Sequence, residues 1–101
     1  MNEDRPETQN AFSDLTAFQR DLLRALAKTD KQSGLSLKTG LATYYDEEIN
    51  HSRLYQNLDE LVAHGFIEKR QRDGRTNSYS LTDAAHTALT DRDAWVRGET
   101  A

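Results

Sequence analysis

Three polar residues in the middle of the chain have the types and the spacing needed to recognise DNA bases. Arg53, Gln56 and Asn57 would share the outer face of one helix, which Glu60 continues. Arginine pairs with guanine in the major groove, and glutamine and asparagine pair with adenine. Any solvated helix also has a polar outer face, so this pattern alone leaves an ordinary surface helix as the alternative.

The beginning of the same helix offers groups that would contact the DNA backbone. Asn50 is a good N-cap, and His51 and Ser52 follow it in the first turn, where free amides and the helix dipole attract phosphate. Tyr55 is placed to add a hydroxyl donor. We therefore predict that Asn50, His51, Ser52 and Tyr55 belong to a DNA-binding surface.

A basic hairpin follows this helix and favours the DNA-binding interpretation. Asp73 and Gly74 stand between two short extended runs, 67–72 and 76–81, which is a strong hairpin signal. The cationic side chains around its tip, with Asp73 as the only acidic residue among them, are Lys69, Arg70, Arg72 and Arg75. A basic tip suits contact with phosphates or with the minor groove, and Asn77 is a weaker candidate. The alternative is a solvated hairpin whose charges serve solubility.

Hydrophobic periodicity predicts the helices that precede these two groups. The first helix ends near Lys28 and begins with a capping box of Thr16 and Gln19; its apolar face is Leu15, Phe18, Leu22 and Leu26. A turn is expected at 29–34. Ser36 would then cap a second helix, in which Gly40 permits close packing and whose apolar face is Leu37, Leu41, Tyr44 and Tyr45.

The third helix is the one that carries the polar face, and a fourth follows the hairpin. Gly65 would end the third helix, whose buried side is Leu54, Leu58, Leu61 and Val62. The last helix begins at Thr82 and Asp83 and has an apolar stripe of Ala85, Ala88, Leu89, Trp95 and Val96. This order predicts a mainly α chain with a small β-hairpin, which is a winged helix-turn-helix with a C-terminal dimerisation helix. In such a fold the third helix enters the major groove.

The predicted domain organisation has three parts. Residues 1–11 form a flexible N-terminal arm, residues 12–83 the winged helix-turn-helix, and residues 84–101 the C-terminal dimerisation helix. The apolar residues expected at the interface of a homodimer are Phe12, Leu15, Leu89, Trp95 and Val96. Two copies would present their third helices to successive major grooves, so an operator would be an inverted repeat.

Composition excludes several classes of protein. The chain has 101 residues, of which 36% are hydrophobic and 30% charged, and it lacks cysteine, so disulfides and zinc–thiolate sites are excluded. Neither a membrane span nor a signal peptide is visible, which predicts a soluble cytoplasmic protein. The three histidines are scattered, and no phosphate loop or nucleophile motif is present. We therefore expect no metal, no cofactor and no enzymatic activity.

The net charge of −4 is unfavourable for DNA binding, because affinity for DNA comes largely from cations that neutralise phosphates. Residues 50–82 nevertheless carry five basic and four acidic groups. The preference for Arg and Asp over Lys and Glu is typical of salt-loving archaea, and ordinary compositional drift is the alternative explanation. In such a protein, inorganic cations held by Glu68 and Asp73 would bridge protein and DNA. A winged helix that serves only for protein–protein contact is the alternative function.

The sequence resembles the PadR-like transcription regulators. The resemblance rests on the run 52–61 (SRLYQNLDEL), on the turn 65–68 (GFIE) and on the run 79–82 (YSLT), and it extends over about residues 16–90. Gln56 replaces the proline that is usual in the family, and Ala84 and Ala85 replace a common Glu-Gly pair. Neither change threatens the fold, and the first frees a side chain for base contact.

The resemblance implies more than the residue pattern does. It implies that Tyr55 contacts DNA and that the terminal helix builds a homodimer. The composition is similar to that of the haloarchaeal branch of the family, which includes a regulator of the response to reactive oxygen species. Membership of that branch would imply a role in stress response, and without cysteine no thiol could sense the oxidant.

Overall fold

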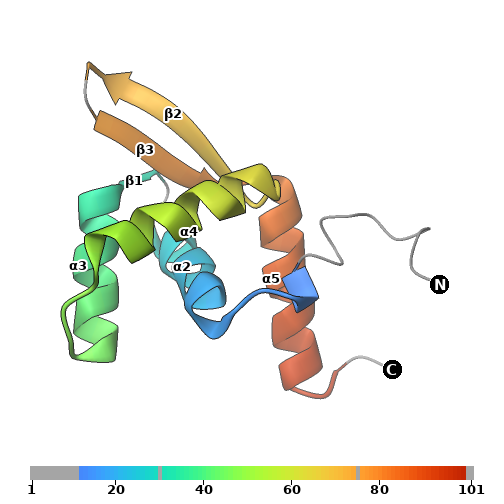
Figure 1. Cartoon of the computed structure of the whole chain (residues 1–101). Coiled ribbons are helices and arrows are strands. Elements are labelled where there is room, and N and C mark those ends of the chain that lie inside the picture. The colour runs from blue at the N-terminus through green and yellow to red at the C-terminus, as the bar shows by residue number, and fades with distance from the viewer. Residues whose placement is uncertain (1–11, 30, 75, 100–101) are drawn as a thin grey trace.

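The computed structural model describes residues 12–29, 31–74 and 76–99. This part of the chain contains four helices and three short strands with defined bounds, and residues 12 and 13 are also helical (Figure 1). The helices are α2 (Ala17–Lys28), α3 (Gly34–Tyr45), α4 (His51–Ala63) and α5 (Asp83–Val96). The strands are β1 (Gln32–Ser33), β2 (Ile67–Asp73) and β3 (Thr76–Leu81). The predicted arm and the first boundary of the predicted domains, residues 1–11, lie outside the described residues.

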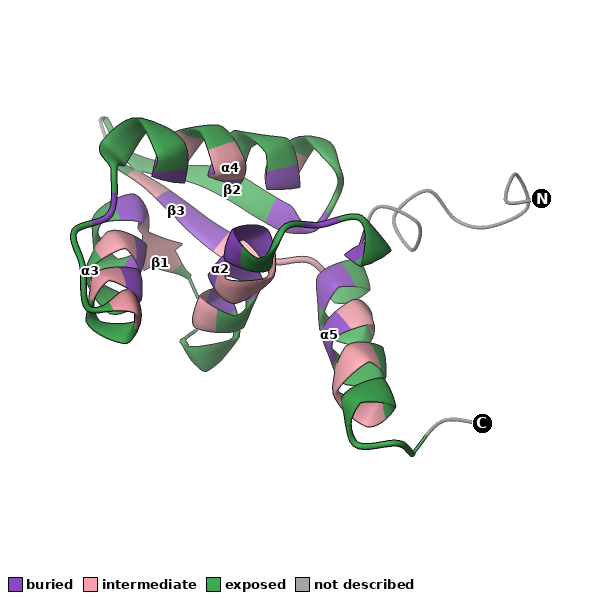
Figure 2. Cartoon of the chain, turned by 60° about the horizontal axis from the view of Figure 1, so that its bottom comes forward, coloured by how far each residue is buried: buried purple, intermediate pink, exposed green. Residues whose placement is uncertain are grey.

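The arrangement is a winged helix-turn-helix, as predicted. In Figures 1 and 2, α3 and α5 lie on opposite sides of α2, and the β2–β3 hairpin, the wing, runs back alongside α4. The sheet is antiparallel with the strand order β1-β3-β2. The pairing of β2 with β3 is irregular between Gln71 and Asp73, next to the hairpin tip.

Strand β1 was not predicted, and it explains why the second helix begins earlier than expected. Gln32 and Ser33 pair with Tyr79 and Ser78 of β3, so the chain is extended immediately before α3. The N-cap is Ser33, whose Oγ accepts a hydrogen bond from the Ser36 amide at 3.1 Å. The prediction that Ser36 caps this helix is therefore wrong, because two residues of strand leave no alternation pattern in the sequence.

The other predicted helix boundaries are confirmed. Thr16 and Gln19 form the capping box of α2, and Asn50 and Thr82 are the N-caps of α4 and α5. The Thr82 hydroxyl also donates to the Gly65 carbonyl at 2.7 Å, which ties the start of α5 to the end of α4. The same hydroxyl thus caps α5 and satisfies a carbonyl just beyond the end of α4.

The core lies between α2, α4 and the sheet. It contains the predicted leucines of the first three helices together with Phe66 and Tyr79, and α5 contributes Ala85 and Leu89. Two expectations for α3 are wrong. Tyr44 is 72% exposed, and a Cβ at Gly40 would meet nothing within 4 Å, so this glycine permits no close packing.

Three residues predicted at a dimer interface belong to the core of the chain itself. Phe12, Leu15 and Leu89 are only 8%, 6% and 5% exposed. Phe12 packs edge-on against Phe66, with ring centroids 5.7 Å apart. Their assignment to the interface needs correction, because their side chains are already covered within one chain. Figure 2 shows that the far end of α5 is exposed instead.

Candidate nucleic-acid interface

Helix α4 presents a continuous polar face to solvent. Its leucines Leu54, Leu58 and Leu61 are buried, whereas Arg53 and Gln56 are exposed on the opposite side. No carboxylate pairs with either of these two side chains within the described part of the chain. Both are therefore available to an external hydrogen-bond partner.

The side chain of Arg53 folds against α2. Its guanidinium carbon lies 3.9 Å from the ring centroid of Phe18, which is a cation–π contact. Stacking uses the face of the planar guanidinium and leaves the N–H groups at its edge free for hydrogen bonds. Arg53 is thus held in place and still able to form a two-pronged contact.

Asn57 makes hydrogen bonds within the protein, whereas its predicted role as a reader of bases stays a prediction. Its Oδ1 accepts from Gln19 Nε2 at 3.0 Å, and its Nδ2 donates to the Arg53 carbonyl at 2.8 Å. A two-pronged contact with adenine needs a free donor and a free acceptor on the same amide. Because each end of the amide already has an internal partner, Asn57 links α4 to α2 and keeps only one N–H and one lone pair for any other contact.

Tyr55 packs against the beginning of α3. A Cβ at Gly34 would lie 2.1 Å from the Tyr55 hydroxyl, so only glycine permits this approach. The ring of His51 lies 4.5 Å from that of Tyr55. A hollow of about 240 Å³ opens here, and among its lining residues are the predicted contacts Tyr55 and Asn77, together with Ser33 at the N-cap of α3.

The residues at the start of α4 differ in whether their side chains already take part in a hydrogen bond. Asn50 is exposed, but its Oδ1 accepts from the Arg53 amide at 2.8 Å and serves as the helix cap. His51 and Ser52 are exposed in the first turn, as predicted. The first turn of α4 and the hollow beside Tyr55 therefore lie next to each other at one end of the helix.

On the wing, two of the cationic side chains form ion pairs with carboxylates. Lys69 Nζ lies 3.7 Å from the Asp59 carboxylate of α4, and Arg70 Nε lies 3.0 Å from that of Glu68. The Glu68 hydrogen bond, with its negative charge, raises the pKa of Arg70. Arg72 is exposed and has no ion-pair partner among the described residues, while Arg75 lies outside them.

A tyrosine–aspartate pair lies beside the Phe18 ring. The ring of Tyr45 stacks against Phe18 with centroids 6.1 Å apart, and its hydroxyl donates to Asp21 of α2. Burial, the hydrogen bond to Asp21 and the charge of that carboxylate raise the pKa of Tyr45 to about 12, and the positive charge of Arg53 opposes this rise. Residues of α2, α3 and α4 thus meet around one aromatic ring.

Sequence reasoning missed the contribution of α2 to this surface. Phe18 was assigned only to the apolar face, and Gln19 only to the capping box. A glutamine in a capping box needs no burial, yet Gln19 is only 7% exposed, which the structure explains by a second partner. Its second partner is 38 residues away in the chain, so no local pattern identifies it.

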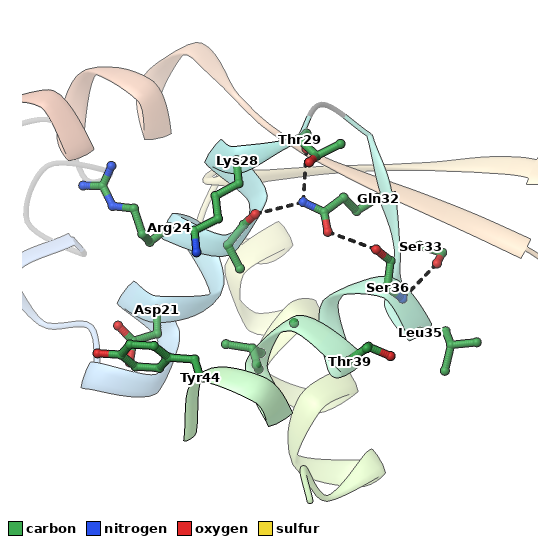
Figure 3. A pocket seen from close by; sticks show the side chains of 13 residues that line it. Asp21, Arg24, Lys28, Thr29, Gln32, Ser33, Leu35, Ser36, Thr39 and Tyr44 are labelled. Carbon is green, nitrogen blue, oxygen red and sulfur yellow. Dashed lines mark hydrogen bonds between the residues drawn. The ribbon is translucent and has the colours of Figure 1, made fainter. Parts of the chain in front are cut away.

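A further groove lies elsewhere on the described surface. It has a volume of about 700 Å³ and is lined by residues of α2, β1 and α3, including the exposed Leu35 and Tyr44 (Figure 3). None of the predicted DNA-binding residues lines it. Within the described ranges, no group of three potential ligands comes together for a metal, and no helix has the length and apolar character needed to cross a bilayer.

Two of the residues predicted at a dimer interface are exposed. Trp95 and Val96, at the far end of α5, are 65% and 62% exposed. The Arg92 guanidinium lies 5.6 Å from the Trp95 ring centroid. Arg24 of α2 pairs with Asp93 of α5 at 2.6 Å, so the two helices are in contact close to these two apolar side chains.

Comparison with known proteins gives matches in sequence and in structure. Residues 22–91 match the family described as the transcriptional regulator PadR-like family, whereas no curated protein matches the chain. RosR of H. salinarum superposes with a TM-score of 0.81 and 45% identity, over 85% of this chain and 77% of that chain. The complex structure of hsRosR-S4 has a TM-score of 0.86 and 42% identity, over 91% and 79% of the two chains. PadR of Bacillus subtilis in complex with operator DNA superposes with a TM-score of 0.65 and 25% identity, over 76% of this chain and 47% of that chain.

Proposed function

Because the chain belongs to the PadR-like family of transcriptional regulators, we propose that it binds double-stranded DNA with the exposed face of α4 in the major groove. The observation that carries this proposal is the pair Arg53 and Gln56. Both side chains are exposed and pair with no carboxylate in the described structure, and the guanidinium of Arg53 rests on the ring of Phe18. A regulator of this kind acts by binding, without catalysis and without a cofactor.

Contacts to phosphate complete the proposed interface. His51 and Ser52 lie where the amides of the first turn of α4 attract an anion, and Tyr55 and Asn77 line the hollow beside them. The wing, with Arg72 as its unpaired cation in the described region, would follow the backbone or the minor groove. The contact expected of Arg75, which lies outside the described residues, stays a prediction of the same kind.

We propose a homodimer built through α5. Trp95 and Val96 form an exposed apolar end on a helix that is otherwise anchored to the domain. Covering a large aromatic side chain favours association, because exposed apolar patches mark interaction sites. In a dimer the two α4 helices would enter major grooves about 34 Å apart on an inverted repeat. Light scattering should show a dimer at micromolar concentration and a shift toward monomer for Trp95→Ala; a monomeric wild-type protein would contradict the proposal.

Acidic groups on the wing suit DNA binding in concentrated salt. Glu68 neutralises Arg70, and Asp73 is exposed with no ion-pair partner among the described residues. Such carboxylates would hold inorganic cations between protein and phosphate. Affinity should then depend only weakly on salt, whereas a steep loss would show that bare cations dominate binding. The role in stress response stays a prediction from the family resemblance.

The experiment that tests the proposed function compares two arginines. A preferred duplex is first obtained by selecting the purified protein against a random-sequence pool. Arg53→Ala should lower affinity for the preferred duplex by about 1–3 kcal/mol and leave random DNA nearly unchanged, because a base contact discriminates between sequences. Arg72→Ala should lower both affinities by similar factors, because a phosphate contact carries no sequence information.

Two outcomes would change this assignment. If no duplex is enriched in the selection, α4 does not read sequence and the winged helix serves another partner. If Arg53→Ala weakens both duplexes equally, Arg53 contacts the backbone. Gln56, which is exposed and leaves both ends of its amide free of hydrogen bonds within the described structure, would then be the better candidate for base contact.

A further inference from the structure

Two consecutive residues of α2 contact two residues of α4 that are one helical turn apart. Phe18 lies under the guanidinium of Arg53, with 3.9 Å from the guanidinium carbon to the ring centroid. Gln19 Nε2 donates to Asn57 Oδ1 at 3.0 Å. Neither α2 residue is exposed enough to contact DNA itself, since Phe18 is 5% and Gln19 is 7% exposed. Any effect on recognition must therefore pass through α4.

The orientation of the Gln19 amide is fixed from both sides. Its Oε1 accepts from the Thr16 amide at 3.0 Å, as the capping box of α2 requires. Its Nε2 must then face Asn57, and Asn57 can only turn its own Nδ2 toward the Arg53 carbonyl. This chain of hydrogen bonds holds the backbone of Arg53 at a set distance from α2.

The Phe18 ring is equally well supported. It stacks against Tyr45 of α3 with an angle of 28° between the rings, and the Tyr45 hydroxyl donates to Asp21, on the same helix as Phe18. Phe18 therefore cannot turn without disturbing contacts with two other helices. The guanidinium of Arg53 rests on a rigid surface while its backbone is tied down by Asn57.

We propose that Phe18 is a positioning residue for sequence recognition, which presents the N–H edge of Arg53 to the DNA. The proposal rests on the proposed function, because it assumes that Arg53 contacts a base. A long arginine side chain loses conformational entropy when it binds, and a side chain that is already stacked loses less. Phe18 would raise affinity for the preferred duplex without touching it.

The first test follows Arg53 in the protein alone, without DNA. The ring current of Phe18 should shift the Arg53 Nε–H resonance in an NMR spectrum of the folded wild-type protein. Phe18→Leu keeps an apolar side chain in the core but removes the ring, so this resonance should move to the position typical of a free arginine. An unmoved resonance would overturn the proposal whatever the protein does with DNA.

The second test is a double-mutant cycle on the selected duplex and on random DNA. Phe18→Leu should lower the ratio of the two affinities by about two- to fivefold, the size expected for an exposed cation–π contact. The same substitution should leave the ratio unchanged in the Arg53→Ala background, because its effect passes through Arg53. An equal effect in both backgrounds would show that Phe18 acts by another route.

A matched control separates positioning from loss of stability. Phe66→Leu also removes a buried ring, but Phe66 packs against Phe12, away from Arg53. It should lower the melting temperature and leave the ratio of affinities unchanged. If Phe66→Leu lowers that ratio as much as Phe18→Leu does, the effect is general loosening and the proposal fails. If Arg53→Ala itself leaves the ratio unchanged while the resonance moves, only the proposed base contact of Arg53 fails.

Discussion

Helix α4 and the wing carry their functional charges in opposite ways. Arg53 of α4 is held by an aromatic ring and by no carboxylate in the described chain. On the wing, Lys69 and Arg70 are each paired with a carboxylate. The buried side of α4 is a row of leucines, whereas in β2 only Ile67 is buried.

The difference indicates a division of labour. A stacked and unpaired arginine has its geometry fixed and its charge available, which suits recognition of one base. Cations that are already neutralised add little net attraction to phosphate, which suits a protein with an acidic total charge. We therefore expect α4 to determine sequence preference and the wing to determine how affinity responds to salt.

The largest expected effect is a difference between α4 and the wing in how much a substitution lowers the free energy of unfolding. Leu58 is fully buried on α4, so Leu58→Ala should lower the free energy of unfolding by about 2–5 kcal/mol through the cavity it leaves. Arg72→Ala on the exposed wing should change it by at most about 0.5 kcal/mol. Denaturant titration followed by circular dichroism measures both. A large loss for Arg72→Ala would mean that the wing is part of the folded core.

A smaller effect concerns the paired cations of the wing. Asp59→Asn and Glu68→Gln together would free Lys69 and Arg70, so binding should tighten at low salt and fall more steeply as salt rises. The logarithmic salt slope should steepen by about one for each freed cation that meets a phosphate.

Glu60→Gln is the matched control for the salt experiment. Glu60 is exposed on α4 and pairs with no cation among the described residues. Its substitution removes a negative charge without freeing a cation, so the slope should stay close to that of the wild type. Equal slopes for all variants would show that Lys69 and Arg70 do not approach phosphate.

The smallest effect lies in the alkaline range, at the tyrosine beside Phe18. The pKa of Tyr45 is raised to about 12 from an ordinary value of 10.0, so the fold favours the neutral hydroxyl. The resulting stabilisation is complete below about pH 10 and is lost as the pH rises through about 12. Asp21→Asn should lower the pKa of Tyr45 only in part, because burial is the largest cause of the shift.

Tyrosinate absorbance during an alkaline titration measures this pKa. The chain has four tyrosines, so the difference between wild type and Tyr45→Phe identifies the signal. The wing holds a second such tyrosine, because burial also raises the pKa of Tyr79 on β3, and the difference between the two titrations separates Tyr45 from it. If Tyr45 titrates near pH 10, its hydroxyl is solvated and the support beneath Phe18 is weaker than the contacts indicate.

Most of the fold could be predicted from local sequence patterns. The leucines of α4 repeat at helical spacing, Thr16 and Gln19 have the spacing of a capping box, and Asp73 with Gly74 marks the hairpin. Each signal lies within a few residues of the structure it specifies, because helices and tight turns form between near neighbours in the chain. The polar face of α4 could be located for the same reason.

Only the tertiary structure decided which of these polar and apolar residues are free. Asn57 and Gln56 are neighbours of similar type, yet Asn57 is bound to Gln19 of α2 and Gln56 is exposed. Leu89 and Trp95 lie on one predicted stripe, yet the first is buried within the chain and the second is not. Their partners are distant in sequence, and the fit of one helix against another depends on packing in three dimensions, which no local periodicity records.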